Sequence, residues 1–233
     1  MKLLAFETAT EACSVALWHE GEVTERYEIA PRRHAELALP FAQALLDEAG
    51  IAKSALDAIA VGRGPGAFTG VRLAIALAQG LALALDRPVV TVSTLAALAL
   101  AVPTDDSDGS AILAVIDARM GEIYAGAFER DADGLVTPIA DEVLCHAEKL
   151  ELPDRPRWSV LGTGWAAYEQ ALRARLATAP AHTDGSALPH AAAVARLAVR
   201  EYARGNAVDA VLAQPVYLRD KVALTLIEQQ RPR

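Results

Sequence analysis

Residues 61–72 read Val-Gly-Arg-Gly-Pro-Gly-Ala-Phe-Thr-Gly-Val-Arg, a glycine-rich loop between a short apolar run and a long helix of alanine and leucine. Glycine lets the backbone turn sharply, and the free N–H groups of a helix N-terminus attract anions. The P-loop pattern is absent, because Val71 and Arg72 follow Gly70, and the third glycine of a dinucleotide fingerprint comes one residue late. We therefore interpret the loop as a tight strand-to-helix junction, and phosphate binding by it stays open.

The chain around this loop alternates between strand and helix patterns. Gly50 follows a helical apolar stripe that continues through Pro40, and it is a typical residue at a helix C-terminus. The segments predicted to be strands are 2–7, 13–18, 22–28, 58–62 and 89–92, and those predicted to be helices are 34–49, 71–85 and 94–101.

The same order of elements returns after the polar loop 103–109. An apolar strand over 112–117 ends in Asp117, as the strand over 3–7 ends in Glu7. The further predicted elements are strands 122–128 and 158–161, a glycine turn at 162–164, and helices 165–176 and 190–203. This repetition predicts an α/β protein of two similar lobes, residues 1–102 and a smaller 103–233 with a C-terminal tail.

Composition limits the classes of function. Of the 233 residues, 53% are hydrophobic but only 5% aromatic, so the core is built of Ala, Leu and Val. The net charge of −8 argues against broad nucleic-acid binding, although a local contact is compatible with it. Cys13 and Cys145 are expected to be free thiols in a reducing compartment. The N-terminus does not resemble a signal peptide and the apolar stretch 73–85 is too short for a membrane span, so we expect a cytoplasmic protein.

The candidates for chemistry are few. The five histidines form no pair at metal-binding spacing, and no serine stands in a nucleophile elbow, so we expect no metal and no catalytic residue. Glu7, with Thr8, and Asp117 end the first strand of each lobe, where they would face a cleft between the lobes. One interpretation is that they handle phosphate and magnesium; the other is that Glu7 and Thr8 cap a turn.

Two helices are candidate contact surfaces. Beyond Arg72, the helix over 71–85 has Gln79 as its one polar side chain, so it needs cover on nearly every side, from this chain or from another subunit. The last helix carries Arg196, Arg200 and Arg204 at intervals of four residues. This basic stripe is either a solvated face or a contact for RNA phosphate.

Five segments together resemble the bacterial TsaB (YeaZ) family, in order over nearly the whole chain. They are Glu7-Thr8-Ala9-Thr10, Cys13-Ser14-Val15-Ala16-Leu17, Arg33-His34-Ala35-Glu36, the loop 62–72, and Pro215-Val216-Tyr217-Leu218-Arg219-Asp220. The resemblance implies the two-lobed actin/Hsp70-like (ASKHA) fold with a reduced second lobe. It implies a non-catalytic subunit in making threonylcarbamoyladenosine at the tRNA adenosine 3′ of the anticodon.

The resemblance also implies partners. The paralogue TsaD would hold the metal and transfer the threonylcarbamoyl group, and the ATPase TsaE would join the pair. This chain alone would hold no cofactor, with ATP and metal on the partner subunits; it would form a homodimer when the partner is missing. TsaD-like proteins carry a metal-binding histidine pair that this chain lacks. The alternatives are an ATP-dependent phosphotransferase or ATPase and a metal-dependent glycoprotease.

The family's pairing surface maps to the helices 34–49 and 70–85. The implied interface residues are His34, Leu37, Phe41, Leu45, Phe68, Thr69, Arg72, Leu73, Ala76, Gln79 and Gly80.

Overall fold

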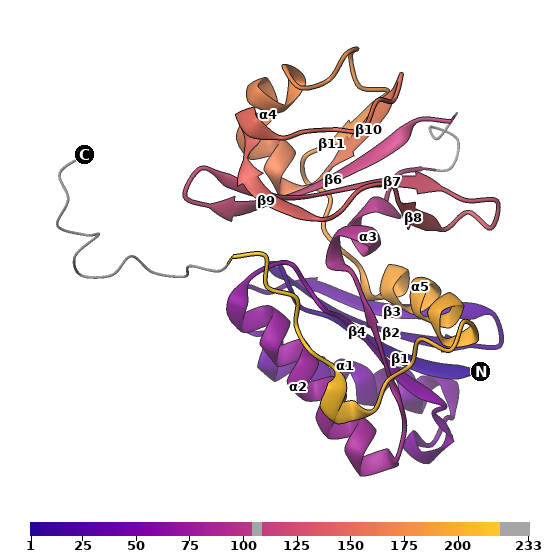
Figure 1. The fold of residues 1–233 in the computed structure, drawn as a ribbon. Helices are drawn as coiled ribbons and strands as arrows, with labels where there is room; N and C mark the ends of the chain where they lie inside the picture. Colours follow the sequence, from indigo (N-terminus) through magenta and orange to yellow (C-terminus); the bar gives the residue numbers. More distant parts are fainter. Residues whose placement is uncertain (104–108, 220–233) are drawn as a thin grey trace, which may run out of the picture.

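Two β-sheets, one in each lobe, organise the chain in the computed structural model, which describes residues 1–103 and 109–219 (Figure 1). The first sheet has the order β3-β2-β1-β4-β5. Its first three strands pair antiparallel in sequence, whereas β4 and β5 continue parallel to β1. The strands are β1 (Lys2–Glu7), β2 (Ala12–His19), β3 (Glu22–Ile29), β4 (Ala58–Gly62) and β5 (Val89–Val92).

The second sheet repeats this order as β11-β10-β6-β7-β8, with β9 also paired to β7. The repetition predicted from the sequence is therefore present in the strand order. In the second lobe β9 and a short 3-10 turn, η2 (Ala147–Lys149), stand where the first lobe has its long first helix, so the strands repeat more completely than the helices. The strands are β6 (Ala111–Arg119), β7 (Glu122–Arg130), β8 (Val136–Pro138), β9 (Val143–His146), β10 (Trp158–Leu161) and β11 (His182–Asp184).

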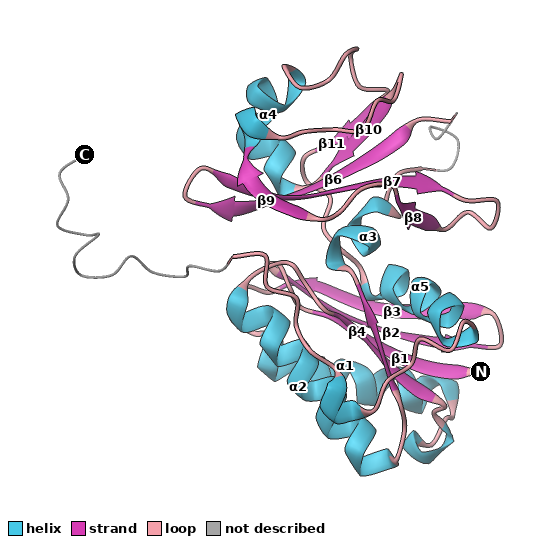
Figure 2. Ribbon diagram, in the orientation of Figure 1, coloured by secondary structure: helices cyan, strands magenta, loops and turns pink. Residues whose placement is uncertain are grey.

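The helices form layers on both sides of the sheets (Figure 2). Helices α1 and α2 cover the outer face of the first sheet, and α4 packs on the second. Helices α3 and α5 lie between the two sheets, where a shared apolar core joins the lobes. The helices are α1 (His34–Ala49), α2 (Phe68–Leu85), α3 (Thr94–Ala99), α4 (Thr163–Arg173) and α5 (Ala191–Ala203), with 3-10 turns η1 (Lys53–Ala55) and η3 (Ala210–Leu212).

Local sequence explains the helix ends. Gly50 ends α1 in the left-handed conformation, with φ of 64°, and its N–H bonds back to Asp47. Helix α2 begins at Phe68 rather than at residue 71, so Gly70 lies inside the helix. A Cβ on Gly70 would come 2.0 Å from the Thr8 carbonyl oxygen. The helix tolerates a poor helix former there because the β1–β2 turn packs directly against it.

Helix α5 crosses from the second lobe back to the first. It packs on β1, β2, β4 and β5, and after it Val208 pairs with Val89 at the edge of the first sheet. We expected residues 103–233 to form the second lobe, whereas α5 packs on the first sheet and Val208 pairs at its edge. That the first lobe ends at residue 102 stays a prediction.

Helix α2 is longer than expected and, by length and composition alone, apolar enough to cross a membrane. The core helix of a soluble protein passes the same test. Here Val71, Ala74, Ala78 and Ala82 form the buried side of the helix.

Candidate functional site

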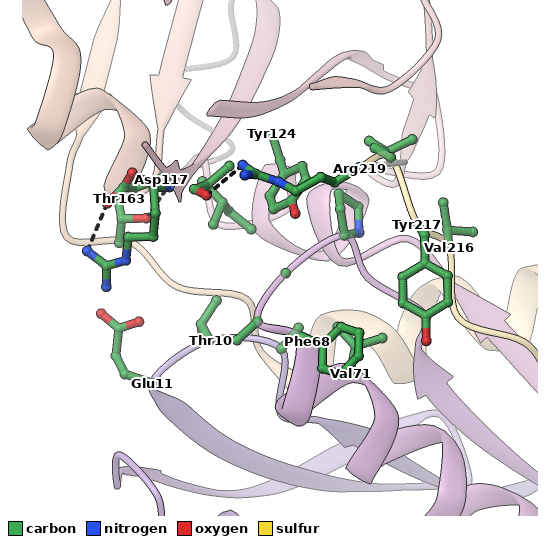
Figure 3. A pocket seen from close by; sticks show the side chains of 18 of the residues that line it. Thr10, Glu11, Phe68, Val71, Asp117, Tyr124, Thr163, Val216, Tyr217 and Arg219 are labelled. Carbon is green, nitrogen blue, oxygen red and sulfur yellow. Dashed lines mark hydrogen bonds and ion pairs between the residues drawn. The ribbon is translucent and has the colours of Figure 1, made fainter. Parts of the chain in front are cut away.

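A cavity of about 720 Å³ lies between the lobes (Figure 3). The first lobe contributes the β1–β2 turn, the glycine-rich loop and the first turn of α2; the second contributes the β6–β7 turn and the start of α4. The polar and aromatic side chains in its wall are Thr10, Glu11, Arg32, His34, Phe68, Asp117, Arg119, Tyr124, Thr163, Tyr217 and Arg219.

Asp117 lies in the cavity wall. Its strand does not end there as expected, because β6 continues to Arg119 past an irregularity in its pairing with β7. The Asp117 carboxylate is already engaged: Oδ2 is 3.0 Å from Arg119 Nη1, and Oδ1 accepts from the Arg119 N–H and the Tyr168 hydroxyl. Thr163 Oγ1 accepts from the Asp117 N–H at 3.1 Å, which ties this strand to α4. A binding role for Asp117 stays a prediction.

Glu7 differs from the expectation, because it does not face the cavity. Its side chain is 1% exposed and lies beneath the glycine-rich loop, where a Cβ on Gly62 would come 2.0 Å from its Oε2. The Ala9 N–H donates to Oε1 at 2.7 Å and the Thr94 hydroxyl donates to Oε2 at 2.9 Å. Burial outweighs these hydrogen bonds and raises the pKa of Glu7 to about 7. Glu7 therefore holds together the turn, the loop and α3.

Thr8 is also buried, and its hydroxyl donates to the Gly70 carbonyl oxygen at 2.8 Å. The contact fixes the β1–β2 turn to the first turn of α2. The interpretation of Glu7 and Thr8 as structural caps fits this geometry, since neither side chain reaches the cavity.

Metal ligands do not gather anywhere in residues 1–103 and 109–219: no group of three or more His, Cys, Asp or Glu is placed to hold an ion. Cys13 is buried and Cys145 half-buried, both free. That this chain alone holds no metal and no cofactor stays a prediction.

The outer face of α1 and α2 carries most of the predicted interface residues at its surface. On α2, Phe68, Thr69, Arg72, Ala76 and Gly80 are exposed, and Leu73 is half-buried. On α1, His34, Leu37 and Phe41 are half-buried, and the His34 ring hydrogen-bonds the Thr10 carbonyl. A cavity of about 330 Å³ between the helices has a mostly apolar wall that includes Leu39, Pro40 and Leu81.

Two of the predicted interface residues are placed differently. Leu45 is 1% exposed and belongs to the core between α1 and the first sheet, so it cannot contribute to a surface. The apolar stripe in the sequence did not distinguish the side of α1 that faces the sheet from the adjacent side that faces outward. Gln79 is half-buried, and its amide donates to the Ala213 carbonyl oxygen at 3.0 Å. The C-terminal segment therefore covers one flank of α2.

The basic stripe on α5 is interrupted. Arg200 Nη1 lies 2.7 Å from Asp131 Oδ2, and Nη2 donates to the Val136 carbonyl oxygen, so this guanidinium joins α5 to the second lobe. A continuous stripe through Arg200 was wrong, because the tertiary fold supplies its acidic partner. Arg196 and Arg204 are exposed, and their contact with RNA stays a prediction.

Sequence reasoning missed several residues of the cavity wall. Arg32 and Arg119 both have positive φ, 70° and 66°, in turns that carry no glycine at those positions. Tyr124 stands among apolar residues of β7, and nothing in that pattern indicates that its side chain faces a cleft. Tyr217 and Arg219 stood in a segment that the resemblance picked out, but without a role.

Relatives of known family match the chain over nearly its full length. The TsaB proteins named for tRNA threonylcarbamoyladenosine biosynthesis from Escherichia coli K12 and Haemophilus influenzae are 39% and 38% identical, over 96% and 95% of this chain and of theirs. The chain belongs to the TsaB (YeaZ) family. The solved structure of YeaZ from Pseudomonas aeruginosa is 48% identical, covers 93% of this chain and 99% of its own, and superposes with a TM-score of 0.84.

A model of a related family also matches, over residues 23–226: TsaD, tRNA N6-adenosine threonylcarbamoyltransferase. Each lobe of this chain carries a sheet with the same strand order. The fold is thus the two-lobed actin/Hsp70-like architecture, with a smaller second lobe whose described residues contain no counterpart of α1.

Proposed function

We propose that this chain is a non-catalytic subunit of the machinery that makes threonylcarbamoyladenosine on tRNA, and that it acts by binding a TsaD-like catalytic paralogue. It would work in the cytoplasm with a TsaE-like ATPase as a further partner, while ATP and metal stay on the partner subunits. Without its partner, the same surface would pair two copies of this chain.

The observation that carries the proposal is the exposed apolar face of α2. Leu83 is 62% exposed and Phe68 49%, at opposite ends of a helix about 27 Å long. Between them the exposed positions are small or uncharged apart from Arg72, and Ala76 and Gly80 allow another backbone to come close. An exposed apolar helix face of this kind is typical of a site at which another protein binds.

The geometry gives less support to catalysis by this chain. Ser14, His190 and Glu25 lie together, but the Ser14 hydroxyl donates to Glu25 rather than to the histidine, and Ser14 is fully buried. A serine in this arrangement lacks the base that would activate it. The carboxylate of Glu7 is buried and that of Asp117 is paired with Arg119.

One observation favours a second candidate, an ATP-dependent phosphotransferase or ATPase. The cavity between the lobes contains Asp117 and Thr163 and is large enough for a small ligand. Titration calorimetry with Mg-ATP on the isolated chain distinguishes this candidate from the non-catalytic subunit. Tight binding of Mg-ATP supports the ATP-dependent enzyme. The less favoured glycoprotease requires a stoichiometric metal in the purified protein, which elemental analysis measures.

Reconstitution tests the favoured function. Purified chain, TsaD-like and TsaE-like proteins would be incubated with tRNA and threonylcarbamoyl-adenylate, and the modified nucleoside measured by mass spectrometry. We expect product only when this chain is combined with its catalytic paralogue. Turnover by this chain alone, or full turnover without it, would contradict the proposal.

A further inference from the structure

The C-terminal segment Ala213–Arg219 contacts both lobes. In Figure 1 it runs beside α2 toward the space between the lobes, where the described chain ends. Its first contact is the Ala213 carbonyl oxygen, which accepts from Gln79 on α2. Further along, the Val216 N–H donates to the Arg63 carbonyl oxygen at 2.9 Å. Up to this point the segment belongs to the first lobe.

Arg219 carries the segment across to the second lobe. Its Nη2 donates to the Ala118 carbonyl oxygen at 2.9 Å and lies 2.7 Å from Glu122 Oε2. Both partners stand beside the β6–β7 turn (Figure 3 shows the guanidinium directed there). The guanidinium is largely buried, and a charge-assisted contact at such a place is stronger than one in open solvent. One short segment therefore has a fixed end on each lobe.

Tyr217, between these two ends, holds the first turn of α2. Arg72 Nε donates to its hydroxyl at 2.7 Å, and the Arg72 guanidinium lies 3.3 Å from the centre of the Phe68 ring. The Tyr217 and Phe68 rings are 6.2 Å apart. Cation–π and ring contacts of this kind order side chains that would otherwise move freely at the surface.

The position of the segment matters because of where the lobes are already joined. The shared apolar core around α3 and α5 fixes them on one side. Elsewhere two cavities of about 720 Å³ and 670 Å³ lie between the lobes, and Leu218 lies in the wall of both. Beside the second cavity, Glu142 of the second lobe contacts Ser93 and Arg63 of the first. A segment that crosses between two cavities opposes separation of the lobes where packing does not.

We propose that Ala213–Arg219 is a clasp that fixes the second lobe relative to the first and, through Tyr217 and Arg72, fixes the first turn of α2. It acts within the free chain, so its test needs no partner and does not depend on the proposed function.

Spin-label distances measure the clasp directly. Labels would be placed at Ala55→Cys in η1 and Ala167→Cys in α4, two exposed positions on different lobes, in a Cys145→Ser background that leaves the buried Cys13. Double electron–electron resonance then gives the distance distribution between the lobes. We expect one narrow distribution in the parent chain and a broader one after Arg219→Ala.

Hydrogen exchange supplies the second readout. Releasing one end of the clasp should speed exchange of the Val216 amide by about tenfold or more, because its hydrogen bond to Arg63 opens locally. The matched control is Arg155→Ala, which removes an arginine paired with Glu129 at 3.6 Å inside the second lobe. It should change neither readout.

The proposal fails if Arg219→Ala leaves the distance distribution as narrow as in the parent. It fails equally if Val216 stays protected in that variant, or if Arg155→Ala broadens the distribution as much. Thermal unfolding of each variant shows whether it is folded at the temperature of measurement. Should Arg219→Ala fail to fold, Glu122→Gln weakens the same end of the clasp, and an unchanged distribution in it also overturns the proposal.

Discussion

His190 and Glu25, 165 residues apart in the chain, lie 2.8 Å apart between Nδ1 and Oε2. The same carboxylate accepts from the Ser14 hydroxyl at 2.6 Å and from the Ala192 N–H at 2.9 Å. Ser14 in turn accepts from the Ala191 N–H at 2.8 Å. Strands β2 and β3 of the first lobe thus cap the N-terminus of α5, the helix that returns from the second lobe.

Replacing Glu25 should loosen this attachment. Burial opposes the charged form, but the hydrogen bonds from His190, Ser14 and Ala192 outweigh it and hold the pKa of Glu25 below its ordinary value. The ionised form therefore stabilises the fold above about pH 4.5, and this contribution is lost as the pH falls through the lower, folded-state pKa. We expect Glu25→Gln to lower the free energy of unfolding at pH 7 by about 1–3 kcal/mol in urea titrations.

Glu20→Gln is the matched control, since Glu20 also pairs with a histidine, His19 at 3.5 Å, but its side chain is 83% exposed. It should change the free energy of unfolding by less than about 0.5 kcal/mol. If the two substitutions change the free energy of unfolding equally, Glu25 does not cap the N-terminus of α5.

Glu7 gives the opposite dependence on pH. With its pKa raised to about 7, the folded state binds a proton that the unfolded chain has released above about pH 4.5. Protonated Glu7 therefore stabilises the fold below about pH 4.5, and this stabilisation is lost as the pH rises to about 7. The free energy of unfolding should fall by up to about 3 kcal/mol over this range. Glu7→Gln should remove this part of the pH dependence, seen as the difference between the unfolding free energies of the two proteins from pH 5 to pH 8. Parallel pH profiles would contradict a buried, titrating carboxyl.

Two glycines of α2 should respond in opposite directions. A Cβ on Gly70 would come 2.0 Å from the Thr8 carbonyl oxygen, so Gly70→Ala must displace backbone and should cost about 2–4 kcal/mol of unfolding free energy. Gly80 has open space around its Cβ position, and Gly80→Ala should stabilise the helix by about 0.5–1 kcal/mol. Chemical denaturation measures both. A tolerated Gly70→Ala would mean that the turn and the helix are not in close contact in solution.

A charge on the exposed face of α2 should prevent pairing without unfolding the lobe. Ala76 is exposed in the middle of this face, and Ala76→Glu should weaken binding to the TsaD-like paralogue by about tenfold or more, because the partner would bury an unpaired carboxylate. A charge at Leu73 should act likewise. Size-exclusion chromatography with light scattering measures the complex and any homodimer.

Ala167→Glu places the same charge on exposed α4 and should leave pairing unchanged. Unfolding of Ala76→Glu as a monomer would instead mean that this face is internal core. Undiminished pairing would move the partner surface elsewhere on the molecule.

Local signals were sufficient for the elements. The apolar stripe and Gly50 place α1, the apolar runs and turns place the strands of the first sheet, and the apolar strand that contains Asp117 marks the second copy. These features depend on neighbours a few residues apart, so they can be read from the sequence. The family also follows from such segments, since the residues that carry the resemblance stay in order along the chain.

The tertiary structure alone decided which groups meet. Glu7 became buried because the glycine-rich loop closes over it, and Leu45 became core because α1 turns that side to the sheet. Glu25 meets His190 only because α5 crosses back to the first lobe, and Arg200 meets Asp131 because the same helix lies between the two lobes. Burial and long-range pairing depend on how the sheets and helices pack, and no pattern within one segment specifies that packing.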